Sequence, residues 1–230
     1  MSGEAQLADF LREANAFGRD NGSEILGEFD RSASLLLAWI KLLKNNLTGT
    51  ADELLAAVLS AVREAAAFAA VGAIRPALFS LRAQPDLLLS WIYFKDHPVE
   101  YSSLCRTGDN YVLKKEAVKY MADNYEGFGS KIGVLNQVVG RTQLDPYRLL
   151  SAHIHSQSPF VINQVDRLED IIQDKRLALE CAKVQAEVSE YLSDIVFSLG
   201  IYGGASLPRV VKDNLRARVK TDGQRSVIFG

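Results

Sequence analysis

The sequence has few of the residues that build covalent or metal-bound frameworks. Two cysteines, Cys105 and Cys181, occur in 230 residues, far apart and without a Cys-x-x-Cys pair. This excludes a disulfide framework and a cysteine-based zinc site of the usual spacing. The three histidines do not form a His-Glu-x-x-His frame. The sequence therefore predicts neither a bound metal nor any other cofactor.

Long apolar segments and an excess of one charge are missing as well. The longest apolar run, residues 65–74, is far shorter than the roughly 20 residues that span a bilayer. The N-terminal residues lack the apolar core of a signal peptide. A formal net charge of −2 creates no general attraction to nucleic acid or to an anionic membrane, although it allows a locally basic site. We therefore expect a cytoplasmic protein without a membrane partner.

Apolar residues recur at helical spacing along most of the chain. They predict helices over residues 2–17, 23–46, 50–71, 76–95, 114–125 and 166–199. A turn is expected at Asp20–Gly22 and a break at Gly72, and Pro85 should either kink its helix or begin a new one. Because no segment alternates like a strand, the sequence predicts an all-α fold, a single helical bundle with long antiparallel helices.

The same pattern suggests three regions. Residues 1–49 are expected to form a helical hairpin packed on a helical core of residues 50–205. Residues 206–230 contain more basic than acidic side chains and are expected to form a mobile tail. Within this tail, residues 227–229 could form a short strand or a docking segment.

One stretch, residues 145–159, carries two of the three histidines and its own helix signals. Asp145 is suited to the N-cap and Pro146 to the first helical position. Pro159 should end the helix. The stretch is thus expected to be one short, well-defined helix.

The faces of this helix separate its polar residues. Because a helix turns roughly 100° per residue, Ser151 and His155 should lie on the side of Arg148. His153 should lie on the opposite side, among leucines. The spacing therefore favours His155 over His153 as the neighbour of Arg148.

These side chains match the needs of RNA cleavage without a metal. Histidine exchanges protons near neutral pH, and arginine offers a fork of donors to phosphate oxygens. Arg148 is thus the candidate phosphate contact, and His155 or His153 is the candidate acid or base. Ser151 would orient the substrate or the histidine. The structural alternative makes His153 a core residue and His155 a helix-end residue.

The spacing also resembles that of a known family. Both Arg148-Leu-Leu-Ser-Ala-His153 and the interval to His155 fit arginine, four to six residues, then histidine, within the pattern Tyr147-Arg-x-x-Ser-x-x-x-His. Together with residues 74–98, this resembles the HEPN superfamily over roughly residues 50–200. Many HEPN domains are metal-independent RNases of bacterial toxins and defence systems, with a site formed across a homodimer. The resemblance implies a homodimer, RNA as a partner and Tyr147 as a substrate contact.

Two arginines of the preceding apolar helix are further candidates. Arg82 lies one turn from Asp86 among leucines, where an unpaired buried charge costs several kcal/mol. This favours an internal ion pair. The functional alternative makes Arg75 or Arg82 a second phosphate contact at the Arg148 site.

Two weaker patterns lie between residues 96 and 131. Asp96, His97 and Glu100 could ligate a metal, but they lack a metal-binding frame. Lysines interleaved with tyrosines over residues 111–131 could grip single-stranded RNA or form a solvated helix face.

Two functions follow from these residues. The first is a ribonuclease or RNA-targeting protein of toxin or defence type, which needs Arg148 and a histidine exposed in one cleft. The second is a non-catalytic helical module that oligomerises or binds a protein partner. It predicts Arg148 buried in an ion pair and both histidines packed.

Overall fold

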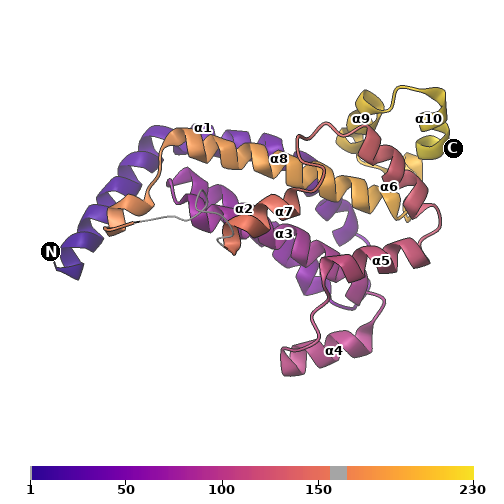
Figure 1. Cartoon of the computed structure of the whole chain (residues 1–230), viewed down its shortest axis with the longest axis horizontal. Helices are drawn as coiled ribbons and strands as arrows, with labels where there is room; N and C mark the ends of the chain where they lie inside the picture. Colours follow the sequence, from indigo (N-terminus) through magenta and orange to yellow (C-terminus); the bar gives the residue numbers. More distant parts are fainter. Residues whose placement is uncertain (1, 156–164) are drawn as a thin grey trace. The chain divides into compact units, whose positions relative to one another are not determined.

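The computed structural model describes residues 2–155 and 165–230, and within them the chain is all-α, as the sequence predicts. No β-strand occurs in these residues, and the only strand-like pairing among them is an isolated bridge between Ala73 and Ile172. The α-helices, labelled in Figure 1, are α1 (Gly3–Lys44), α2 (Asp52–Ala70), α3 (Ile74–Phe94), α4 (Pro98–Thr107), α5 (Lys114–Asn124), α6 (Phe128–Gln137), α7 (Pro146–Ile154), α8 (Lys175–Ser198), α9 (Arg209–Arg218) and α10 (Asp222–Phe229). Short 3₁₀ helices lie on either side of α8, η2 (Leu168–Ile171) before it and η3 (Gly204–Ser206) after it.

The N-terminal helix α1 is unbroken over 42 residues (Figure 1). The predicted turn at Asp20–Gly22 is therefore wrong, and residues 1–49 do not form a helical hairpin. Gly22 is buried, and a Cβ added there would meet the carbonyl oxygen of Ala70 at 3.3 Å. Asn21 donates its side-chain amide to the carbonyl of Phe17 at 3.3 Å, one helical turn back. Residues that favour a turn locally thus serve packing and hydrogen bonding inside a long helix.

Several other helix boundaries follow the predicted signals, whereas α4 and α6 lie in segments for which no helix is predicted. α2 begins at Asp52 and ends before Gly72, and α5 begins at Lys114. α3 continues through Pro85, so a new helix does not begin there. α8 begins at Lys175, nine residues later than the expected start at 166.

The C-terminal residues are helical rather than a mobile tail. They form α9 and α10, and the strand considered for residues 227–229 is wrong because these residues lie in α10. Val211 and Leu215 of α9 and Ile228 of α10 are buried. The many basic residues of this segment led to the wrong prediction of a mobile tail. The apolar residues between them recur at helical spacing, which is the pattern of a helix.

The chain groups into two compact units, each with its own core. The first comprises the described residues of Met1–Ala33, Ser60–Gln84 and Asp145–Val188. The second comprises Ser34–Leu59, Pro85–Leu144 and Ser189–Gly230. The ranges 1–49, 50–205 and 206–230 are a different division of the chain and stay a prediction.

The core of the first unit is rich in small side chains. Ala61, Ala65 and Ala69 form a buried stripe with a spacing of four residues on α2. Small side chains let neighbouring helices pack closely. Gly72 is required at the end of this helix, because its φ is +81° and a Cβ would lie 2.8 Å from Ile172 Cγ2.

The core of the second unit contains larger side chains, including both tryptophans. Trp39 and Trp91 are buried, and each indole N–H has a hydrogen-bond acceptor. Trp39 Nε1 donates to Ser193 Oγ at 2.8 Å, and Trp91 Nε1 donates to Asp52 Oδ1 at 3.2 Å. These bonds give large apolar side chains a fixed orientation in the core.

Candidate functional site

The helix that carries the candidate residues begins as predicted. Asp145 is the N-cap of α7 and accepts a hydrogen bond from the Tyr147 amide at 3.2 Å, with Pro146 in the first turn. The helix ends at Ile154, and His155 is its C-cap. Pro159, the predicted stop, lies outside the described residues.

Arg82 of α3 anchors this helix within the first unit. Its guanidinium carbon lies 3.5 Å from the centroid of the Tyr147 ring, and its Nε donates to Ser151 Oγ at 3.1 Å. Burial lowers the pKa of Arg82 from its ordinary value, while Tyr147 and Asp145 act in the opposite direction. Two predicted site residues, Tyr147 and Ser151, thus contact a third. The contacts set the orientation of α7, whatever further role these three residues have.

Arg148 and His155 are both exposed. Helical geometry places them on one face of α7, since they are seven residues, or about two turns, apart. Arg148 has no hydrogen bond or ion pair with the rest of the chain that the structure describes. Within the described residues, nothing therefore engages its guanidinium.

His153 differs from His155 in its surroundings. It is half-buried, and burial lowers the pKa of its imidazole. Burial therefore disfavours the charged form of the His153 side chain. The structure thus separates the two histidines, as the predicted helix faces do.

Arg75 of α3 is the other arginine predicted as a second phosphate contact. It is exposed near the start of α3, and its guanidinium lies 5.4 Å from the centroid of the Phe79 ring on the same helix. No contact between the side chains of Arg75 and Arg148 is found in the described chain. A role of Arg75 as a phosphate contact stays a prediction.

The Asp96 region forms a packed aromatic cluster. His97 stacks on Tyr93 with ring centroids 4.1 Å apart, and its Nδ1 lies 2.7 Å from the Tyr93 carbonyl oxygen. Asp96 accepts hydrogen bonds at 2.9 Å from the hydroxyls of Tyr120 and Tyr125. Across the described ranges, no three His, Cys, Asp or Glu residues gather in a way that could hold a metal ion. Tyr120 and Tyr125, which were considered above as RNA contacts, thus donate hydrogen bonds to the Asp96 carboxylate.

A cluster of buried ions in the second unit was not predicted. Arg141 Nη1 lies 2.7 Å from Asp194 and 3.1 Å from Glu190, and Arg218 pairs with the same two carboxylates. The side chains of Asp194 and Arg141 are 0% and 1% exposed, so this cluster is a structural feature of the core. The available signal was the pair Glu190 and Asp194, four residues apart within the most buried segment of α8.

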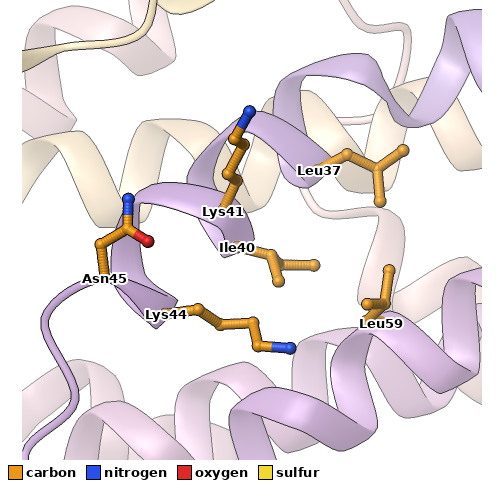
Figure 2. Close-up of a pocket in the computed structure, with 6 residues that line it drawn as sticks. All are labelled: Leu37, Ile40, Lys41, Lys44, Asn45 and Leu59. Atoms are coloured by element: carbon orange, nitrogen blue, oxygen red, sulfur yellow. The ribbon is translucent and has the colours of Figure 1, made fainter.

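A pocket of about 380 Å³ also lies in the second unit, where α1 ends (Figure 2). Figure 2 shows Ile40 inside it and the ammonium of Lys44 reaching toward Leu59, whereas Lys41 points away. Both lysines belong to the last turn of α1, where cations offset the helix dipole. That structural role accounts for these charges without a ligand.

Comparison of the chain with protein-family models, curated proteins and solved structures finds no match. Within the described residues, none of the helices combines the length and apolar character required to cross a membrane. The function is therefore argued from the residues themselves.

Proposed function

We propose that the chain is a metal-independent ribonuclease, resembling HEPN proteins of toxin or defence type. Arg148 is the phosphate contact and His155 the acid or base. The observation that supports this proposal is the exposure of both side chains on one face of α7, with Arg148 unpaired in the described chain. The interaction-module alternative expects Arg148 buried in an ion pair and both histidines packed, and the exposure of Arg148 and His155 does not fit that expectation.

The proposed reaction is an internal transfer of the phosphate. His155 removes the proton from a ribose 2′-hydroxyl, and the resulting oxygen attacks the adjacent phosphorus. Two N–H groups of Arg148 donate to the non-bridging oxygens, where negative charge accumulates. The bond to the 5′-oxygen breaks, leaving a 2′,3′-cyclic phosphate and, after protonation, a 5′-hydroxyl.

This reaction needs both an acid and a base. One α7 face presents a single exposed histidine, His155. A two-fold homodimer would bring a second copy of that face, so that one imidazole accepts a proton while the other donates one. We therefore propose that a homodimer is the active form.

The contacts of Arg82 support the same site. They hold Tyr147 and Ser151, which lie immediately before and three residues after Arg148. These contacts orient the helix that carries Arg148 and ends next to His155, and positioned catalysis requires such a defined orientation.

The test is cleavage of a single-stranded RNA by the purified full chain in EDTA, with detection of the cyclic phosphate. Arg148→Ala and His155→Ala should each lower the cleavage rate by about 10²-fold or more. Arg63→Ala is the matched control, because Arg63 is also exposed in the first unit. It should cleave like the wild type.

The two histidines are distinguished in the same assay. His153→Ala should keep most of the activity if His155 is the acid or base. Equal rates for the wild type, Arg148→Ala and His155→Ala would contradict the proposal. Absence of cleavage by a wild-type homodimer would contradict it too, and would favour the interaction module.

A further inference from the structure

A second cavity, of about 490 Å³, lies in the second unit and belongs to no site described above. It is lined by residues of α6, α9, α10, the end of α8 and the glycine-containing loop after α8. This volume is within the range of small-molecule sites. The cavity shares no residue with α7.

The charged side chains that line the cavity are all basic. Lys131, Lys212 and Arg216 line the cavity, and none of its described lining residues is Asp or Glu. Lys212 donates to the Ala205 carbonyl oxygen at 2.9 Å, whereas Lys131 and Arg216 form no hydrogen bond or ion pair with described residues. Three basic side chains in one lining, with no acidic side chain among the described lining residues, favour a ligand that carries negative charge.

Aromatic side chains form part of the same lining. Phe197 is buried, Tyr202 is partly exposed and Phe229 is 46% exposed. An exposed aromatic ring beside cations can pack against a flat organic group while the cations hold an anionic group. The lining thus suits a ligand with both parts.

Two glycines leave the backbone of the cavity open. A Cβ added to Gly203 or Gly204 would meet no heavy atom within 4 Å, and the φ of Gly203 is −66°, which any residue adopts. Neither packing nor backbone conformation therefore requires these glycines in the free protein. Their lack of side chains does allow a ligand to approach the main chain.

We propose that this cavity binds a small phosphate monoester whose organic part is flat and largely apolar. The phosphate would lie against Arg216 and Lys131, and the organic part against Tyr202 or Phe229. Arginine suits this role because its planar fork can donate two hydrogen bonds to phosphate oxygens. This binding site is independent of the proposed nuclease activity.

The test is isothermal titration calorimetry of the full chain with phenyl phosphate. Adenosine monophosphate forms a second arm, and the tighter of the two distinguishes an aryl from a nucleoside source. Arg216→Gln should weaken binding of the tighter ester by about tenfold or more, equal to roughly 1.4 kcal/mol. Arg209→Gln is the matched control, because Arg209 is on the same helix and its side chain is 96% exposed. It should bind like the wild type.

Glycine variants test the approach to the backbone. Gly203→Ala and Gly204→Ala should keep the melting temperature of the wild type but weaken the ester. Inorganic phosphate and phenol, titrated separately, should each bind more weakly than phenyl phosphate. The proposal is overturned if neither ester binds at millimolar concentration, if phosphate alone binds as tightly, or if Arg216→Gln leaves binding unchanged.

Discussion

Arg141 and Arg148 are seven residues apart in the chain, yet their environments are opposite. The Arg141 side chain is 1% exposed and contacts two carboxylates, and Arg148 is exposed without a partner in the described chain. The residue type alone therefore does not indicate the role of an arginine. Burial and pairing decide whether its charge stabilises the fold or remains available to a ligand.

The buried cluster is balanced in charge. Arg141 and Arg218 face Glu190 and Asp194, and Gly140 donates its amide to Glu190 at 2.8 Å. Removing one charge from such a group leaves another buried and uncompensated, which is more costly than the loss of the pair itself. The exposed Arg148 carries no such penalty, because water solvates it in the free protein.

Asp194→Ala is the change with the largest expected effect. It leaves two buried guanidinium groups short of a carboxylate and should lower the free energy of unfolding by about 3–5 kcal/mol. Urea denaturation followed by circular dichroism measures this loss. Asp213→Ala, at an exposed carboxylate paired with Arg209, should change it by less than about 0.5 kcal/mol. Equal effects would show that burial does not separate the two carboxylates.

Arg148→Ala and Arg141→Ala should affect different properties, the first the cleavage activity and the second the stability. Arg148→Ala should lower RNA cleavage about 10²-fold or more, with a change in unfolding free energy below about 0.5 kcal/mol. Arg141→Ala should mainly lower stability, because it leaves buried carboxylates unpaired. Cleavage at a temperature where both variants stay folded, together with thermal unfolding, separates these effects. A strong loss of stability in Arg148→Ala would contradict the view that Arg148, unlike Arg141, does not stabilise the fold.

Tyr147→Leu tests whether the contact between Arg82 and Tyr147 anchors α7. It keeps an apolar side chain but removes the ring face under the Arg82 guanidinium, and should lower stability by about 1–2 kcal/mol. Tyr111→Leu is the control, since the Tyr111 residue is 70% exposed. Thermal unfolding of both variants gives the comparison. An equal shift for the two would contradict an anchoring role for Arg82.

The smallest effect is expected from His153 and pH. Its pKa is lowered in the folded chain, so the unfolded chain binds more protons as the pH falls through about 6.5. The contribution of His153 to stability is therefore complete above that pH and decreases below it. His153→Gln should show a smaller loss of stability between pH 7.5 and 5.5 than the wild type. Parallel pH profiles would exclude this residue as a source of acid sensitivity.

Local signals predicted α7 well. The N-cap at Asp145, Pro146 in the first turn and the separation of His153 from His155 all follow from residues within one short helix. The same reasoning failed at residues 20–22, where turn-forming residues continue α1 because Gly22 packs closely on Ala70. It failed again at 206–230, where basic residues concealed two helices.

The partners of the charged residues required the structure. Arg82 was expected either to pair with an acid or to contact phosphate, and the observed stacking on Tyr147 is a contact across 65 positions. The pairing of Arg218 with Asp194 likewise joins α9 to α8. No local pattern indicates which of the 26 basic residues finds such a partner.

The amino-acid sequence by itself determined that the described chain is helical, where several of its helices begin and which residues share a face of α7. These properties depend on interactions within a few turns, such as capping, the fixed φ of proline and apolar spacing. The tertiary structure decided which arginines are buried in pairs and which face solvent. The physical reason is that the free energy of a charge depends on its distance from water and from opposite charges, and both are set by segments distant in the chain.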